Sequence, residues 1–256
     1  MTEPVQFGPR YETTRQAWEN IWDSASVERE LQAMNYARAK QALKIYTTYL
    51  PKDGMILEAG SGLGAMVITL RRLGYNVVGL DYAANALHVS RAYDPSLPLL
   101  VGDVHALPHP TNSLAGYLSF GVLEHFEHGM SPALAEAFRV LRPGGIMVLT
   151  IPYPNIIHRF VAWRRRQQGI TILNDDEFYE STYTREALVT NVTAAGFEVV
   201  RAIPTSHAYT LWGIGALFRG SGYYQTSPLA DALGALLERV LPWPFNFTTC
   251  IIARKP

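Results

Sequence analysis

Short apolar runs alternate along the chain with longer segments in which apolar residues recur every three or four positions. The short runs are typical of β-strands, and the longer segments are typical of amphipathic helices. Because helical segments separate the first five runs, the pattern predicts an α/β fold with a parallel, doubly wound sheet. The predicted strands cover residues 55–60, 76–81, 97–103, 115–121, 145–151, 198–203 and 248–254.

Capping residues mark several helix starts between these strands. Ser131-Pro132 combines a cap residue with proline at the first helical position. Thr184 is expected to cap the helix that precedes the sixth strand. Leucines at helical spacing follow Ser227-Pro228 and predict a further helix before the last strand.

A glycine-rich turn follows the first predicted strand, where residues 56–64 read I-L-E-A-G-S-G-L-G. Glycines let the backbone turn sharply and let a ligand approach closely. The second strand ends in Asp81, and an acidic side chain there can accept hydrogen bonds from both hydroxyls of a ribose. This strand–turn–helix–strand unit predicts a nucleoside-containing cofactor.

The glycine spacing also fits a dinucleotide site if Ala65 takes the last position. Glu58 argues against a nicotinamide dinucleotide, because a carboxylate before the glycines repels a pyrophosphate and suits an ammonium group. Asp103 ends the third predicted strand and can accept a hydrogen bond from an adenine amino group, while Val104 packs on the ring. A nicotinamide-dependent oxidoreductase remains an alternative.

Five segments in this order resemble the class I S-adenosylmethionine-dependent methyltransferases, of the group that methylates small molecules. The resemblance implies a Rossmann-like, mostly parallel seven-stranded sheet whose last strand is antiparallel and lies beside the sixth, and S-adenosyl-L-methionine as the cofactor. The matching segments are E-A-G-S-G-L-G (58–64), Asp81, G-D-V-H-A-L-P (102–108), S-F-G-V-L-E-H (119–125) and L-R-P-G-G-I-M-V-L (141–149).

The resemblance also implies a set of cofactor ligands. Glu58 would bind the methionine amino group, Asp81 the ribose, and Asp103 with Val104 the adenine. The remaining residues expected at the cofactor are Gly60, Ser61, Gly62, Gly64, Tyr82 and Phe120.

The chain is expected to form one domain, 1–256, because its length suits a single α/β unit with additions. Residues 1–50 are aromatic-rich and helical in pattern, and either close over the cofactor or pack on the core. The insertions after the fifth and sixth strands are together expected to form part of a lid over an apolar acceptor pocket. The expected parts are a helical cap (1–50), a cofactor-binding core (51–152), an insertion (153–183) and a C-terminal part (184–256) with its own insertion (204–247).

Methyl transfer requires the protein to position a nucleophile and exclude water, and an oxygen acceptor also needs a base. His125, beside Glu124 just past the fourth strand, is the candidate base; the alternative is that it lines the cofactor pocket or caps a turn. Tyr153 is a candidate for orienting the acceptor, although its flanking prolines can also simply end the strand. The predicted reaction is methylation of an oxygen or nitrogen atom of a small, partly apolar acceptor. A catalytically silent cofactor-binding or membrane-associated module is a second alternative.

Composition narrows the possible partners and the location. The 22 basic and 22 acidic residues give no net charge, which argues against non-specific nucleic-acid binding. The single cysteine, Cys250, excludes internal disulfides and is expected to be buried. No histidine, cysteine and carboxylate cluster has metal-ligand spacing, so no metal is expected. The absence of a signal-peptide pattern and of a membrane-spanning run predicts a cytoplasmic protein.

Residues 156–168 read I-I-H-R-F-V-A-W-R-R-R-Q-Q and predict a basic amphipathic helix. Such a helix can contact an anionic membrane surface or an anionic substrate, or it can simply expose a solvated face. Its basic residues are Arg159, Arg164, Arg165 and Arg166.

Overall fold

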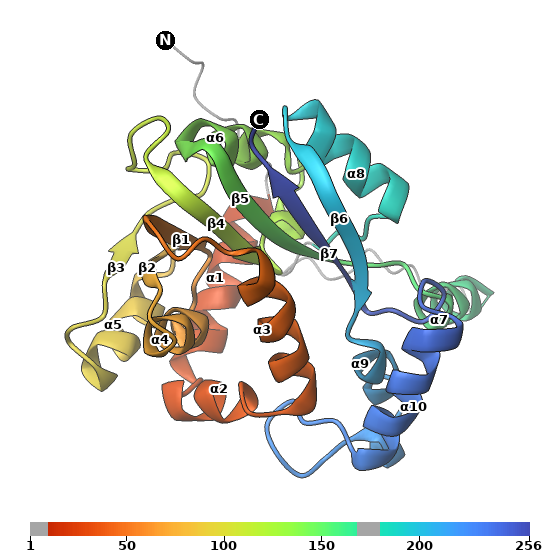
Figure 1. Ribbon diagram of the computed structural model, residues 1–256. Helices are drawn as coiled ribbons and strands as arrows, with labels where there is room; N and C mark the ends of the chain where they lie inside the picture. The colour runs from red at the N-terminus through yellow and green to blue at the C-terminus, as the bar shows by residue number, and fades with distance from the viewer. Residues whose placement is uncertain (1–9, 168–179) are drawn as a thin grey trace.

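The computed structural model describes residues 10–167 and 180–256, with the side chains of residues 165 and 166 excepted. Seven strands form one sheet in the order β3-β2-β1-β4-β5-β7-β6 (Figure 1). The first five strands pair in parallel, and β7 lies antiparallel between β5 and β6. The predicted α/β sheet with an antiparallel last strand is therefore confirmed. The strands are β1 (Met55–Ala59), β2 (Asn76–Asp81), β3 (Leu99–Val101), β4 (Leu114–Phe120), β5 (Leu141–Pro152), β6 (Glu198–Thr205) and β7 (Thr248–Arg254).

Helices cover both faces of this sheet. α6 and α8 pack on one face, while α3, α4 and α5 pack on the other. The described helices are α1 (Arg10–Asp23), α2 (Val27–Ala33), α3 (Ala37–Tyr49), α4 (Ala65–Arg72), α5 (Ala84–Tyr93), α6 (Ser131–Val140), α7 (Ile156–Gln167), α8 (Arg185–Ala194), α9 (His207–Trp212) and α10 (Pro228–Val240), with 3-10 turns η1 (Leu123–His125) and η3 (Ala216–Phe218).

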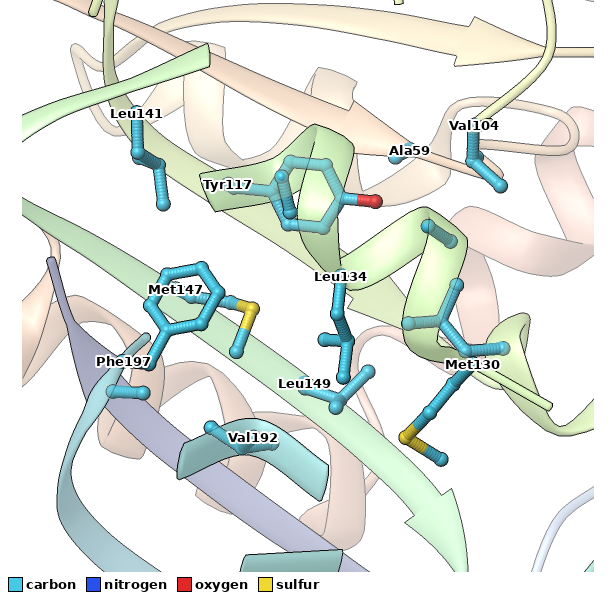
Figure 2. Close-up of a cluster of buried hydrophobic side chains, with 14 of the residues drawn as sticks. Ala59, Val104, Tyr117, Met130, Leu134, Leu141, Met147, Leu149, Val192 and Phe197 are labelled. Carbon is cyan, nitrogen blue, oxygen red and sulfur yellow. The ribbon is translucent and has the colours of Figure 1, made fainter. Parts of the chain in front are cut away.

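The core consists of two apolar layers because side chains alternate between the faces of each strand. Ile56 packs in the layer under α3, α4 and α5, and the adjacent Leu57 packs in the opposite layer. Figure 2 shows the second layer, where Tyr117 and Met147 of the sheet lie with Leu134 of α6. All five of these side chains are completely buried. Cys250 is also buried, as predicted.

The predicted caps are found at two helices. The Thr184 side chain accepts a hydrogen bond from the Ala187 N–H, and Ser227 accepts one from Ala230. At α6 the predicted cap lies one residue late, since Met130 is the cap residue and Ser131 is the first residue of the helix.

The fifth strand starts four residues earlier than the sequence pattern predicts. Leu114 pairs with Leu141 and Gly116 pairs with Ile146, so the ladder shifts register between them. The residues between Leu141 and Ile146 therefore form an irregular start to a strand that was expected to begin at residue 145.

Candidate active site

A cavity of about 440 Å³ lies at the carboxyl ends of the parallel strands. Its wall includes residues from the end of β1, β2, β4 and β5 and from the start of the antiparallel β7. Figure 1 shows α1, α2, α9 and α10 gathered at this end of the sheet. This is the edge at which open α/β sheets bind ligands. The strand residues in the wall are Glu58, Asp81, Phe120, Thr150 and Thr248.

The glycine turn forms part of the cavity wall and needs its glycines. Gly60, Gly62 and Gly64 have positive φ angles of 82°, 49° and 71°, a region that other residues rarely adopt. A Cβ atom on Gly60 would lie 2.3 Å from Cγ2 of Val122, and one on Gly62 would lie 2.7 Å from the Trp22 ring. Only glycine therefore fits the first two positions.

Asp81 is fixed at the end of β2 by the backbone around it. Its Oδ2 accepts a hydrogen bond of 2.7 Å from the Gly62 N–H, and its Oδ1 accepts one of 2.9 Å from the Ala83 N–H. Burial raises the pKa of Asp81, and these hydrogen bonds act in the opposite direction. Each oxygen has further acceptor capacity, so the carboxylate can hold the glycine turn and bind a hydroxyl pair at once.

Glu58 ends β1 in the wall of the same cavity and is 5% exposed. Its Oε2 has no hydrogen-bond partner among the described residues. Burial raises the pKa of Glu58 to about 8. The carboxyl accepts a backbone hydrogen bond from Val67, but an unpaired oxygen on a buried carboxyl is costly, and an ammonium group supplies both the missing donor and the compensating charge. The residue thus fits the amino group of a methionine moiety.

Asp103 lies beyond the end of β3, where two side chains engage its carboxylate. The Tyr11 hydroxyl donates to Oδ2, and the His105 Nδ1 lies 2.7 Å from Oδ1. Burial acts to raise the pKa of Asp103, but the hydrogen bonds from His105 and Tyr11 outweigh it and hold the pKa below its usual range. Asp103 and the buried Val104 are outside the cavity wall in the described chain, so their adenine role stays a prediction.

The helical cap contributes residues that the motifs did not identify. Tyr11, Thr14, Trp18 and Trp22 of α1 line the cavity, while Tyr46 of α3 stacks on Phe120 with ring centroids 4.7 Å apart. The aromatic content of residues 1–50 was the available signal. Residues of the cap line the cavity and also pack in the core, so closure over the cofactor stays a prediction.

The other predicted cofactor residues lie in the cavity wall as well. They are Gly60, Ser61, Gly62, Tyr82 and Phe120. Gly64 is outside the wall and is the N-cap residue of α4.

Of the three catalytic candidates, only His125 reaches the cavity. It lies in η1, is 8% exposed, and meets the Trp18 ring edge-on with centroids 5.5 Å apart. Glu124 is buried and lies outside the cavity wall. Burial raises its pKa well above the usual range, and the charge of Glu180 acts in the same direction. Tyr153 also lies outside the wall and packs against Trp243, with centroids 5.9 Å apart.

The basic helix α7 is separate from the cavity, because none of its described residues lines the wall. Arg159 and Arg164 are exposed, and the side chains of residues 165 and 166 lie outside the description. Within residues 10–167 and 180–256, no helix combines the length and apolar character needed to span a bilayer.

Comparison with known proteins agrees with this geometry. Residues 57–149 match the family model described as a methyltransferase domain. A probable S-adenosylmethionine-dependent methyltransferase of Mycolicibacterium smegmatis is 31% identical over 167 residues, which are 65% of this chain and 60% of that protein. The chain thus spans about three fifths of that relative. A ubiquinone/menaquinone biosynthesis C-methyltransferase UbiE of Dinoroseobacter shibae is 32% identical over 188 residues, covering 64% of this chain and 72% of that protein.

The fold is shared with solved structures at lower identity. One is the 1,6-didemethyltoxoflavin-N1-methyltransferase of Burkholderia thailandensis with bound 1,6-didemethyltoxoflavin and S-adenosylhomocysteine, with a TM-score of 0.61, 15% identity and coverage of 100% of this chain and 93% of that one. The family matches favour methyl transfer over the nicotinamide alternative. The chain therefore belongs to the class I S-adenosylmethionine-dependent methyltransferases, with S-adenosylmethionine as its cofactor.

Proposed function

We propose that the enzyme methylates an oxygen or nitrogen atom of a small, partly apolar acceptor. The observation that carries this proposal is the extension of the cavity beyond Glu58 and Asp81, across the ends of β4, β5 and β7. The wall of this extension is mostly apolar, which suits an acceptor with a partly apolar body. Its apolar residues are Ala33, Met34, Ala39, Ala42, Tyr46, Phe120 and Phe247.

The residues of the site have separate roles in the proposed reaction. When bound, the cofactor supplies a methyl group activated on a sulfonium. Glu58, Asp81 and the glycine turn bind and orient the cofactor, and the aromatic residues of α1 exclude water from the cavity. His125 accepts the proton from an acceptor hydroxyl at a ring nitrogen, whereas a neutral amine acceptor attacks without a base.

The test of this function is an acceptor screen that measures S-adenosylhomocysteine formation with small phenols, amines and carbon nucleophiles. Product from phenols or amines supports the proposal. Product from carbon nucleophiles alone, or from none of the panel, contradicts it.

Replacing Asp81 with alanine is expected to reduce cofactor affinity by about 1.5–3 kcal/mol, the range for hydrogen bonds to a charged group. Calorimetric titration with S-adenosylhomocysteine measures the change. Asp94→Ala is the control, because Asp94 bonds only locally, to Ser96. An unchanged affinity would show that Asp81 does not bind the ribose.

The arginines of α7 have two possible partners, an anionic lipid surface and an anionic group of the substrate. The exposure of α7 favours the lipid surface. Phe160 and Trp163 are 55% and 56% exposed on the same helix as the exposed Arg159 and Arg164. Large apolar side chains beside basic ones are typical of helices that lie in a membrane interface. The distance of α7 from the cavity wall speaks against contact with the acceptor.

Glutamine replacement of Arg164, Arg165 and Arg166 is expected to reduce co-sedimentation with phosphatidylglycerol vesicles at low salt, by about fivefold in affinity per charge. The difference should shrink near physiological salt, because charges are screened over about 8–10 Å. The double variant Arg71→Gln, Arg72→Gln removes two exposed charges from α4 and serves as control. Equal sedimentation of parent and triple variant at both salt concentrations would show that α7 is only solvated.

A further inference from the structure

The two ends of the cavity lie at different parts of the sheet. At one end, Asp81 terminates β2 and is the expected ribose ligand. At the other end, Arg38 of α3 contacts Tyr209 of α9, the helix that follows the edge strand β6. Since β1, β4, β5 and β7 lie between β2 and β6, the Arg38 end is remote from the ribose ligand. It belongs to the part of the cavity assigned to the acceptor.

Arg38 is the one lysine or arginine among the described residues of the cavity wall. Its guanidinium carbon lies 4.7 Å from the centroid of the Tyr209 ring, and the residue is half-buried. No ion pair within 4.0 Å in the described chain includes Arg38. The Tyr209 ring therefore orients the guanidinium, while no close carboxylate occupies its N–H donors.

Glu30 is the acidic residue that shares this end of the cavity. Burial raises its pKa, while a hydrogen bond from Tyr223 and the more distant charge of Arg38 act in the opposite direction. The Tyr223 hydroxyl takes up part of the acceptor capacity of Glu30. No ion pair within 4.0 Å joins Glu30 to Arg38 in the described chain, so the guanidinium donors stay open to an anion.

We propose that Arg38 determines acceptor specificity by binding a carboxylate of the acceptor, at the end opposite the atom that receives the methyl group. This inference rests on the proposed function, because it assigns the far end of the same acceptor cavity. The planar fork of guanidinium donors matches the two oxygens of a carboxylate, and stacking on Tyr209 holds the plane of that fork. An apolar wall lies between Arg38 and the place of methyl transfer. The acceptor class is therefore a small aromatic or aliphatic acid that carries a hydroxyl or an amine.

The experiment compares matched acids and amides as acceptors. Hydroxy- and amino-substituted benzoic, phenylacetic and cinnamic acids, each with its primary amide, are assayed for methyl transfer with the parent, Arg38→Gln and Arg38→Lys. Arg219→Gln is the matched control, because Arg219 lies 4.4 Å from the Trp212 ring in a similar stack but outside the cavity wall. Calorimetry with S-adenosylhomocysteine checks each variant for folding and cofactor binding.

The expected result is that the parent prefers acids to amides in kcat/KM, mainly through KM, and that Arg38→Gln reduces this preference about 10–100-fold. Arg38→Lys should retain part of the preference, and Arg219→Gln should retain all of it. Equal use of acid and amide by the parent, or a preference unchanged in Arg38→Gln, overturns the inference about Arg38 but leaves the proposed function standing. Loss of S-adenosylhomocysteine binding in Arg38→Gln also overturns it, because the charge would then serve the cofactor. Methyl transfer to no member of the panel contradicts the proposed function itself.

Discussion

Glu58→Gln is expected to weaken S-adenosylmethionine binding roughly 10–100-fold, the range for loss of a hydrogen bond between charged partners, while stabilising the unliganded protein at pH 8. The amide keeps the shape of the buried side chain but cannot carry a negative charge. The first effect follows from the loss of the partner for the cofactor's ammonium group. The second follows from burial, which raises the pKa of Glu58 to about 8 from an ordinary value of 4.5.

The sign of the stability effect follows from proton binding. Between pH 4.5 and 8 the folded protein holds a proton on Glu58 that the unfolded chain has released. The free energy of unfolding therefore falls as pH rises through this window. Glutamine removes this loss, so the variant should gain on the order of 1–3 kcal/mol relative to the parent at pH 8 and little at pH 4.5.

Thermal unfolding of the unliganded proteins at several pH values, together with calorimetric titration, measures both effects. Parent affinity should rise from pH 6 to 7.5 as binding releases the proton from Glu58, whereas the variant should show no such dependence. Glu186→Gln changes an exposed carboxylate in the first turn of α8 and is the matched control. Parent-like affinity in Glu58→Gln would show that another group binds the ammonium.

The local sequence pattern predicts the sheet and the carboxyl ends of β1 and β2 well, although it misplaces the ends of β3 and the start of β5. Each strand is an apolar run of a few residues, and the acidic residues that end β1 and β2 are adjacent to their runs in sequence. Glu58 and Asp81 therefore reach one cavity as soon as the two strands pair in parallel. Positive φ angles at the glycine turn are equally local, which explains why the sequence predicts that these residues lie together in one cavity wall.

The acceptor end was not predictable, because it is built from contacts between distant segments. Arg38 meets Tyr209 only after the cap and the addition following β6 both pack at the same end of the sheet. The contact between Tyr11 and Asp103 is similarly remote in sequence. Helical spacing shows that these segments fold into helices, but it does not show which side chains two helices bring together.

The separation of Glu124 from His125 has the same origin. The two are adjacent in sequence, yet η1 turns Glu124 into the interior and His125 toward the cavity. Burial raises the pKa of Glu124 well above its usual range, and the side chain lies outside the cavity wall, so it does not reach a bound acceptor. Among the predicted catalytic residues, His125 therefore stays the candidate general base.

His125→Ala is expected to reduce turnover about 10²–10⁴-fold with a hydroxyl acceptor, the range for loss of a general base. His125 lines the cavity wall and meets the Trp18 ring edge-on, which limits the directions that the imidazole can take. Cofactor affinity should stay close to that of the parent, because Glu58, Asp81 and the glycine turn are unchanged.

Single-turnover measurements with a phenol and with the corresponding neutral aniline separate base catalysis from positioning. The variant should lose its rate with the phenol and keep most of it with the aniline, since a neutral amine attacks without prior loss of a proton. His128→Ala, at an exposed position three residues later, should behave like the parent with both acceptors. An equal loss with the two acceptors would mean that His125 only shapes the cavity, because a missing side chain that misplaces the acceptor slows both nucleophiles alike. Full activity with the phenol would remove the base from the mechanism, leaving orientation of the acceptor and exclusion of water as the source of the rate.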